Sequence, residues 1–169
     1  MLAGRYTLLE PRGADEVFAA AAGRGIIAVG VFNSGILANQ RASANSTYNY
    51  EPARLGLISW ANELAEVCEQ HGSTLPHAAL AFPSNNPSVV SVAVGMRTSA
   101  QVARNVELLN APPPQSLWDE LYDSGLLAGA VRWSSRRASA VSKPVWATGV
   151  STRVLAALAR YSTGNTVVG

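Results

Sequence analysis

Residues 32–37 (FNSGIL) form the first segment whose residue types suit ligand chemistry. They close a continuous apolar run, so the polar residues stand where a buried strand would end. A turn of small residues exposes backbone N–H groups, and Ser34 adds a hydroxyl donor. Both suit the oxygens of a pyrophosphate. Alone, an Asn-Ser-Gly sequence is more typical of an ordinary turn.

A second candidate anion site lies at residues 95–98 (GMRT), where another apolar run gives way to a helical pattern. The first turn of a helix has free N–H groups and a partial positive charge, which favour anions. Arg97 would hold a ribose 2′-phosphate or stack on adenine. Thr98 and Gln101 fit a capping box, with each side chain reaching the other's backbone N–H. The alternative is a solvated Arg97 and a Gln101 that only caps.

Other reactive residue types favour plainer interpretations. Cys68 falls on the apolar stripe of a predicted helix, and His71 and His77 lie on either side of a helix break. We therefore expect structural roles for all three and no metal site. The loop at residues 48–50 (YNY) would line a substrate entrance or, equally well, be a solvated loop in which Asn49 caps a helix.

Hydrophobic patterns predict the elements that position these residues. Apolar runs at residues 2–9, 26–32 and 89–94 predict strands buried on both faces. Their spacing around a helical segment is that of a βαβ unit, which implies parallel pairing. Ser116 and Asp119 resemble a further helix cap. Helices are predicted at residues 14–22, 52–70, 75–82, 99–109, 117–122 and 151–161.

The faces of two predicted helices follow from apolar residues at helical spacing. The helix at 52–70 carries one apolar stripe, made of Leu57, Ala61, Leu64, Ala65 and Cys68. The helix at 99–109 is expected to face inward with Val102, Val106 and Leu109.

Composition bounds the class of protein. With 169 residues, 48% of them hydrophobic and 14% charged, the chain fits a globular protein and not a disordered one. It is shorter than the roughly 250 residues of a closed eightfold β/α barrel. One cysteine and an N-terminus without a secretory pattern predict a reducing, cytoplasmic compartment. No apolar stretch reaches the ~18 residues of a membrane span.

Charge is unevenly distributed. Residues 1–123 hold all 11 acids and seven arginines, a net charge of −4, whereas residues 124–169 hold six basic residues and no acid. A basic tail with Trp133 and Trp146 could contact nucleic acid, but it carries no known motif, so nucleic acid is not an expected partner. A shifted reading frame or artefactual extension is the other explanation.

Several motifs in unbroken order resemble the aldo/keto reductase family, closest to its branch of bacterial threo-aldose (L-fucose) and pyridoxal dehydrogenases. The resemblance covers about residues 2–127 and does not extend to 128–169. The motifs are residues 2–10 (LAGRYTLLE), 30–38 (GVFNSGILA), 48–53 (YNYEPA), 75–109 (LPHAALAFPSNNPSVVSVAVGMRTSAQVARNVELL) and 117–127 (LWDELYDSGLL).

The resemblance implies an α/β fold: a partial (β/α)8 TIM barrel, about its last three β/α units, at residues 1–127. Residues 128–169 would be a basic extension of unknown fold. The predicted strands resemble the sixth, seventh and eighth of the barrel. No residue matches the family's catalytic Asp, Tyr, Lys or His, which lie on earlier strands. The catalytic set expected here is therefore empty, and Tyr6, Tyr48, Tyr50, His71, His77 and Lys143 are not assigned to it.

Residues 1–127 resemble the C-terminal half of the family's barrel. In this family, that half holds a nicotinamide dinucleotide, NADP or NAD. The resemblance places the cofactor turn at Asn33, Ser34, Gly35 and Leu37, with Phe32 as a candidate for packing the nicotinamide. It places the adenosine side at Gly95, Arg97, Gln101 and Asn105. One arginine is compatible with either cofactor.

The implied parent activity is hydride transfer between the cofactor and a small aldose or aldehyde. Without the catalytic groups, the chain alone is predicted to be inactive. Three parallel strands cannot close a barrel, and they leave strand edges and one apolar face exposed. We therefore expect this surface to be covered by a chain that carries the missing half of the barrel, by self-association, or by residues 150–161. The alternatives are a non-catalytic dinucleotide-binding or subunit-assembly module, and a gene fragment without a function.

Overall fold

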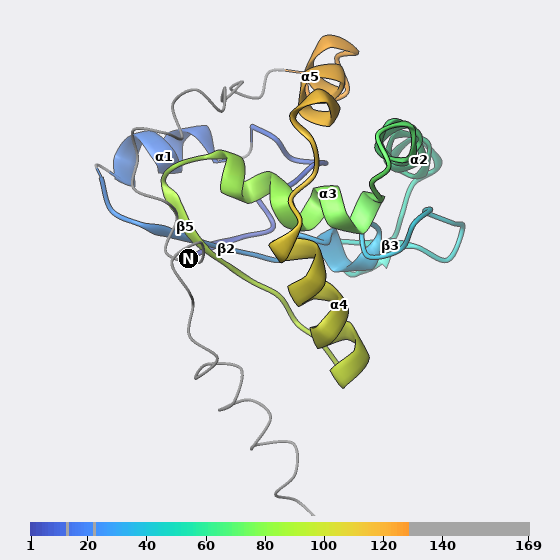
Figure 1. Cartoon of the computed structure of the whole chain (residues 1–169), viewed down its shortest axis with the longest axis horizontal. Coiled ribbons are helices and arrows are strands. Elements are labelled where there is room, and N and C mark those ends of the chain that lie inside the picture. Colours follow the sequence, from blue (N-terminus) through green and yellow to red (C-terminus); the bar gives the residue numbers. More distant parts are fainter. Residues whose placement is uncertain (13, 22, 129–169) are drawn as a thin grey trace, which may run out of the picture. The chain divides into compact units, whose positions relative to one another are not determined.

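The computed structural model describes residues 1–12, 14–21 and 23–128, and Figure 1 shows their arrangement. The predicted helix at 151–161, the tryptophans of the tail and the extension beyond residue 128 lie outside this part. The elements are β1 (Leu2–Ala3), α1 (Asp15–Ala21), β2 (Ile26–Val29), the 3-10 turn η1 (Asn33–Gly35), β3 (Thr47–Tyr48), β4 (Glu51–Pro52), α2 (Leu55–Gln70), α3 (Leu75–Ala81), the 3-10 turn η2 (Phe82–Asn85), β5 (Val89–Ala93), α4 (Ser99–Asn110) and α5 (Gln115–Asp123).

The main sheet has the order β1-β2-β5, and both strand pairs are parallel. Ala28 of β2 stands between Leu2 of β1 and Val92 of β5. Parallel neighbours need a crossover connection, which α1 provides for the first pair and α2 with α3 for the second. The predicted parallel β/α alternation is therefore confirmed.

The first two strands are shorter than predicted, because left-handed glycines end them. Gly4 has φ +62° and Gly30 has φ +71°, a conformation that suits glycine and breaks the extended backbone. A Cβ added to Gly30 would lie 3.3 Å from the Gly4 nitrogen, so the two turns also pass close together. The predicted strands at 2–9 and 26–32 are wrong in length, and the residues beyond the glycines form irregular, largely buried backbone.

The predicted start of α2 is also wrong. Pro52 belongs to β4, which pairs antiparallel with β3, and the helix begins at Leu55. Its predicted apolar stripe is confirmed, since four of its members are buried and Leu57 is half-buried. On α4, by contrast, the predicted inward position of Leu109 is wrong, because its side chain is 37% exposed.

The core lies between the sheet and the helices α2, α3 and α5. Phe82 is fully buried and packs against Tyr6, with ring centroids 4.9 Å apart, and against Trp118 at 6.2 Å. Tyr6 also meets Phe18 edge-on at 4.8 Å. Burial raises the pKa of Tyr6, so its hydroxyl stays neutral inside this aromatic cluster. These rings join the segment after β1, α1, η2 and α5 into one core.

The predicted cap of α5 by Ser116 and Asp119 is wrong. The N-cap is Pro114, and no side chain caps this helix. Ser116 instead lies 2.9 Å from Nδ1 of His71, while Nε2 of the same ring lies 2.6 Å from Glu120. The histidine therefore ties the end of α2 to α5.

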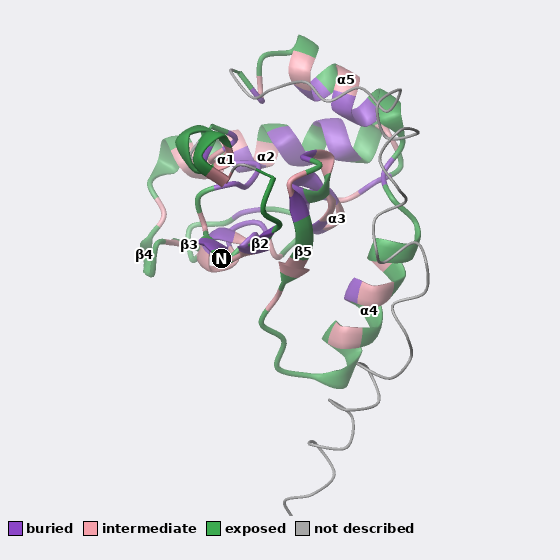
Figure 2. Cartoon of the chain, turned by 90° about the vertical axis from the view of Figure 1, so that its left-hand side faces the viewer, coloured by how far each residue is buried: buried purple, intermediate pink, exposed green. Residues whose placement is uncertain are grey.

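One face of the sheet is covered by helices and the other is open within the described residues. Ile26 and Ala28 of β2 are buried, whereas Ile27, between them, is 37% exposed. Exposed residues also occur on β5. Figure 2 shows this strand buried at Val89 and exposed or half-buried at its later residues. Parallel sheets are normally covered on both faces, so the exposure of Ile27 departs from that arrangement within the described residues.

Candidate functional site

The turn that follows β2 is built from left-handed backbone. Asn33 and Ser34 have φ of 45° and 58°, and Gly35 has φ 111°, a value that only glycine adopts easily. The backbone N–H groups of Gly35 and Leu37 both donate to the carbonyl of Phe32, at 2.9 and 3.2 Å. Three successive left-handed residues are costly, and such strain gathers at ligand-binding turns.

Ser34 is held from both sides by the loop that leads to β3 and β4. The Thr47 hydroxyl donates to its carbonyl at 2.7 Å, and the backbone N–H of Tyr50 donates to its hydroxyl at 3.2 Å. A hydroxyl has one proton to donate as well as two lone pairs. Among the described residues no acceptor takes that proton, so it remains free for a ligand oxygen.

Two of the predicted cofactor residues bury polar atoms that lack a partner. Asn33 is 4% exposed, and neither its amide nitrogen nor its amide oxygen has a hydrogen bond within the described part of the chain. Asn105 is 6% exposed, and its side-chain oxygen likewise has none there. An unsatisfied buried polar group costs about 1–3 kcal/mol, so both asparagines fit positions that a polar ligand completes.

The start of α4 matches the predicted capping pattern only in part. Thr98 accepts from the Gln101 N–H at 3.2 Å, as expected. The Gln101 side chain, however, accepts from the N–H of Arg97 at 2.7 Å and not from that of Thr98. The hydrogen bond from the Arg97 N–H to the Gln101 side chain thus involves the residue before the N-cap, and it orders the segment that precedes the helix. Gly95, Arg97 and Gln101 are all exposed.

An arginine that the sequence reasoning missed connects the two candidate segments. Arg104 of α4 donates to the carbonyl of Ala38, directly after the turn, at 3.5 Å. This places α4 beside the turn that follows β2. The other turn residues are Phe32, which is half-buried, and Leu37, whose side chain is fully buried in the core. Leu37 therefore offers a ligand no side chain, and its backbone N–H already donates to the Phe32 carbonyl.

The loop that supports Ser34 is itself anchored on α2. Asn62 accepts from the Ala42 N–H at 2.9 Å and donates to the Ala42 carbonyl at 3.2 Å. Arg41 adds ion pairs to Glu69 at 2.6 Å and Glu66 at 3.3 Å, and these bonds raise the pKa of Arg41 above its usual value. The exposed ion pairs add little, and the two bonds of Asn62 do most to fix the loop.

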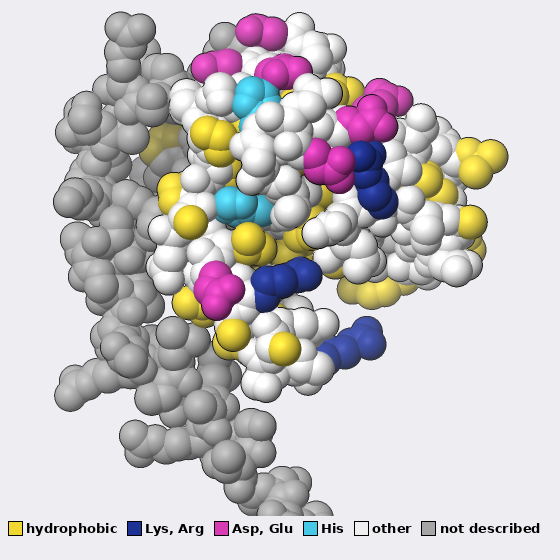
Figure 3. Space-filling model, turned by 45° about the vertical axis from the view of Figure 1, so that its right-hand side comes forward, with side chains coloured by type: hydrophobic (Ala, Val, Ile, Leu, Met, Phe, Trp, Pro, Cys, Tyr) yellow, Lys and Arg dark blue, Asp and Glu magenta, His cyan; other side chains and the backbone are white. Residues whose placement is uncertain are grey.

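The residues that invited a metal interpretation have structural surroundings. Cys68 is fully buried, and burial raises the pKa of its thiol to about 12. His77 lies 3.1 Å from Ser73, and His71 makes the contacts to α5 given above. Both histidines appear on one face in Figure 3, with acidic side chains gathered around one of them. Within residues 1–12, 14–21 and 23–128, no cluster of three metal-ligating side chains occurs.

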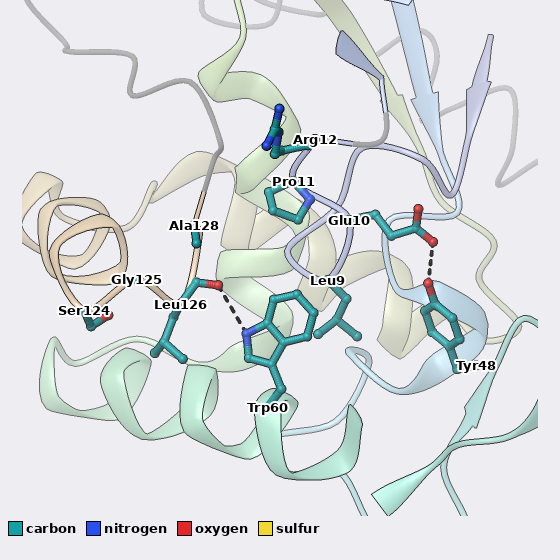
Figure 4. A pocket seen from close by; sticks show the side chains of 10 residues that line it. All are labelled: Leu9, Glu10, Pro11, Arg12, Tyr48, Trp60, Ser124, Gly125, Leu126 and Ala128. Atoms are coloured by element: carbon teal, nitrogen blue, oxygen red, sulfur yellow. Dashed lines mark hydrogen bonds between the residues drawn. The ribbon is translucent and has the colours of Figure 1, made fainter. Parts of the chain in front are cut away.

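A pocket of about 540 Å³ opens between the segment after β1, α2 and the segment after α5. Figure 4 shows Glu10 and Tyr48 at one end, Trp60 near the middle and Ser124 at the other end. The Tyr48 hydroxyl donates to Glu10, which also pairs with Arg5 at 3.1 Å. Nothing in the sequence pattern pointed to Glu10 or Trp60, because they lie on separate segments.

Tyr48 is poorly suited to acid–base work. Burial and the hydrogen bond to the Glu10 carboxylate raise its pKa to about 12. A tyrosine that exchanges a proton near neutral pH needs its pKa lowered, usually by a nearby cation. Of the other tyrosines considered, Tyr6 is buried with a raised pKa, and Tyr50 is 94% exposed.

Comparisons with known proteins agree on one family. The model of the "Aldo/keto reductase family" matches residues 1–123. The chain is 40% identical to a D-threo-aldose 1-dehydrogenase from Pseudomonas sp over 129 residues, which cover 75% of this chain and 39% of that protein. It is 34% identical to a pyridoxal 4-dehydrogenase from Microbacterium luteolum over 130 residues, covering 76% and 38%. The resemblance inferred from the motifs is confirmed.

The chain therefore spans less than two-fifths of the length of these relatives. The structure brings the predicted turn and α4 together, with Asn33 and Asn105 buried and Ser34, Gly95, Arg97 and Gln101 accessible. No helix in the described part of the chain is long and apolar enough to cross a membrane.

Proposed function

Because the chain belongs to the aldo/keto reductase family, we propose that it holds a nicotinamide dinucleotide between the turn at residues 32–37 and the start of α4. The parent reaction is hydride transfer between NADP or NAD and an aldose or aldehyde. The observation that carries the proposal is the pair of buried asparagines, Asn33 and Asn105, whose polar atoms have no partner within the described residues. They lie on the two segments that Arg104 connects.

Each segment has a distinct task in this proposal. The free hydroxyl proton of Ser34 and the Asn33 amide donate to pyrophosphate oxygens. The start of α4 and the exposed Arg97 hold the adenosine side, where the helix dipole favours a phosphate. Gln101 orders the Arg97 backbone through its 2.7 Å bond, which reduces the entropy that binding must overcome. The bound cofactor supplies or accepts the hydride.

We further propose that no residue of this chain acts as the catalytic acid or base. The tyrosines at 6 and 48 have raised pKa values, which oppose proton exchange near neutral pH. The expected result is no NAD(P)-linked oxidation of L-fucose by the purified chain. Turnover above a buffer blank that persists through rigorous purification would contradict this.

Partners follow from the open sheet. The exposed side of β2 and β5 is proposed as an assembly surface. A polypeptide that carries the remaining β/α units would cover this side and bring the catalytic residues. Self-association is the other way to cover it. A cytoplasmic location is proposed on the single free cysteine, Cys68, which is buried.

The second candidate function is a non-catalytic dinucleotide-binding or subunit-assembly module. The accessible turn and α4 favour it, because binding needs only these segments. A gene fragment without a function is the remaining alternative. It predicts aggregation and no cofactor binding.

Titration with NADPH and NADH, followed by nicotinamide fluorescence, tests the proposal. Saturable binding is expected, and Ser34→Ala should weaken it about tenfold, because a donor to a charged phosphate is lost. Ser84→Ala, at an exposed serine of η2, is the matched control and should bind like the parent chain. Absence of saturable binding by a folded, monodisperse parent chain would overturn the proposal.

A further inference from the structure

His71, at the end of α2, stands between two polar side chains of α5. Its Nδ1 lies 2.9 Å from the hydroxyl of Ser116, and its Nε2 lies 2.6 Å from a carboxylate oxygen of Glu120. Ser116 and Glu120 are four positions apart on α5, so they share one face of the helix and meet the same ring. A serine, a histidine and a carboxylate joined in this order are the parts of a hydrolytic triad.

The carboxylate fixes which ring nitrogen carries the proton. An ionised carboxylate only accepts hydrogen bonds, so Nε2 of the neutral His71 ring holds the proton and donates to Glu120. Nδ1 then has a free lone pair, and the Ser116 hydroxyl donates to it. In this tautomer, His71 can take the hydroxyl proton when the serine oxygen attacks. The serine proteases use the two nitrogens the other way round, and the roles are the same.

The ring is held in place while the serine is accessible. His71 is the C-cap of α2, and its backbone N–H donates to the carbonyls of Val67 and Cys68 at 3.3 and 3.2 Å. The His71 side chain is only 17% exposed, whereas Ser116 is exposed. A fixed base beside an accessible hydroxyl is the arrangement that a nucleophilic serine requires.

The start of α5 offers hydrogen-bond donors beside this hydroxyl. The N–H of Leu117 donates to the Pro114 carbonyl at 3.1 Å, and no side chain caps the helix. Among the described residues, no acceptor takes the N–H of Gln115 or of Ser116 itself. Backbone donors at a helix start suit the negative oxygen that forms when a serine attacks a carbonyl group.

A second serine–histidine pair in the described part of the chain shows what the first one adds. Ser73 lies 3.1 Å from Nδ1 of His77, but Ser73 is only 6% exposed. Nε2 of His77 is buried and has no partner within the described residues, so no carboxylate orients that ring. The pair at Ser116 has both the carboxylate and the exposure that the pair at Ser73 lacks.

The charge of α5 favours one class of ester. This helix carries Asp119, Glu120 and Asp123 and no basic residue. Negative charges near the serine repel an ester that itself carries a carboxylate or a phosphate. Because Ser116 is exposed, a short acyl group can reach it without a channel. A short, neutral carboxylic ester therefore fits best.

We propose that Ser116, His71 and Glu120 hydrolyse short, neutral carboxylic esters. The Ser116 oxygen forms a bond to the acyl carbon, and Nδ1 of His71 takes its proton. The bond from the acyl carbon to the alcohol oxygen breaks, and that proton passes to the leaving alcohol. Water then attacks the acyl group with His71 as base, which releases the acid and returns a proton to Ser116. Glu120 is a positioning residue, because it acts through the ring.

This activity goes beyond the proposed function. None of the three residues belongs to the proposed cofactor site or contributes to hydride transfer. Esterase activity and NADPH binding can therefore be measured, and can fail, independently of one another.

The test is hydrolysis of p-nitrophenyl acetate by the purified whole chain, followed by release of nitrophenolate. An initial burst is expected, and an ester whose acyl group ends in a carboxylate should react more slowly. Ser116→Ala should lower the rate to that of the urea-unfolded chain. His71→Gln should lower kcat about a hundredfold, because a general base is lost.

A fluorophosphonate identifies the nucleophile, since the serine oxygen displaces fluoride from phosphorus and leaves a stable adduct. Peptide mass spectrometry should place this adduct on Ser116 in the folded chain and not in the urea-unfolded chain. Because Ser116 is exposed, Ser116→Ala is expected to fold normally and keeps the test decisive if His71→Gln loosens the contact between α2 and α5.

Glu120→Gln tests the positioning role. A glutamine amide at this position can donate to Nε2 and shift the ring proton to Nδ1, so kcat should fall by about tenfold while KM and the unfolding temperature stay unchanged. A merely structural role would instead lower the unfolding temperature and leave kcat unchanged. Ser59→Ala is the matched control, because Ser59 is exposed on α2 and donates to Glu63 at 3.2 Å without a bonded histidine among the described residues. It should hydrolyse the ester like the parent chain.

Three results would overturn the proposal. The first is the absence of hydrolysis by a folded, monodisperse parent chain. The second is hydrolysis that Ser116→Ala leaves unchanged, and the third is a fluorophosphonate adduct found only on other residues. An unchanged kcat in Glu120→Gln would remove the carboxylate from the mechanism and so contradict the proposed triad.

Discussion

The helical layer and the turn edge of this protein differ in the side chains that they bury. In the helical layer, formed by α2, α3, η2 and α5, the side chains that fill the interior are mostly apolar, with Phe82 and Leu64 fully buried. One buried polar atom of this layer, Nε2 of His77, also has no partner among the described residues. At the turn edge, formed by η1, the loop to β4 and α4, Asn33 and Asn105 are buried without partners for their polar atoms among the described residues.

Backbone strain follows the same division. The four non-glycine residues with positive φ in the described part of the chain are Asn33, Ser34, Asn49 and Tyr50, and all belong to the turn edge. Each such residue costs about 1–3 kcal/mol and persists only where its surroundings hold it. We therefore propose that the helical layer supplies stability and that the turn edge gives up part of it for the proposed cofactor site.

Truncating the helical layer should have the largest effect. Phe82→Ala removes a fully buried ring that contacts Tyr6 and Trp118, and should lower the free energy of unfolding by about 3–5 kcal/mol. Urea denaturation measures it. Leu55→Ala is the control, because Leu55 is 82% exposed and its loss should change stability by less than about 0.5 kcal/mol. Equal effects would show that the layer is not the stabilising core.

Cutting the link between the two regions should have an intermediate effect. Asn62→Ala removes both side-chain bonds to the Ala42 backbone and should cost about 1–3 kcal/mol. Because the loop positions Ser34, NADPH binding should weaken as well. Asn62→Asp keeps the acceptor for the Ala42 N–H and should recover part of both losses. Weakened stability with unchanged NADPH affinity would show that the loop does not position the turn.

A change in the turn edge should separate binding from stability. Asn105→Leu replaces a buried side chain whose oxygen has no partner within the described residues, so stability should stay level or rise by up to about 1 kcal/mol. NADPH affinity should fall about tenfold if the amide contacts the cofactor. Thermal unfolding and fluorescence titration on the same sample give both values. A loss of stability without a loss of affinity would reverse the roles assigned to the two regions.

The last effect is absent at neutral pH and appears only at high pH. The pKa of Tyr48 rises from 10.0 to about 12 on folding, so the folded state favours the protonated phenol. Its contribution is complete below the unfolded pKa and is lost as the pH rises through the window from about 10 to about 12. Tyr48→Phe should therefore show a shallower fall in unfolding free energy across that window. Parallel pH profiles of the two proteins would contradict it.

The order of the main elements could be predicted from the sequence, because apolar periodicity reports which residues must leave water. The three parallel strands and the stripe of α2 came from that signal alone. The lengths of the first two strands could not be predicted in this way. Gly4 and Gly30 end these strands through their φ angles, which hydropathy does not record. The two-residue strands β3 and β4 lie in a polar segment with no periodic pattern.

The candidate site divides in the same manner. The turn after β2 and the start of α4 were found from local residue types. Arg104 was missed, because its contact with Ala38 spans 66 positions in the chain. The Glu10–Tyr48 pair was missed for the same reason, with 38 positions between its members.

By itself, the sequence determined the family, the parallel β/α order and the two segments expected to hold the cofactor, because these depend on local residue types and their spacing. Only the tertiary structure decided that Asn33 and Asn105 are buried without partners among the described residues, and that Glu10, Tyr48 and Trp60 share a pocket. Burial and pocket walls arise when distant segments pack together, and no local pattern records that contact.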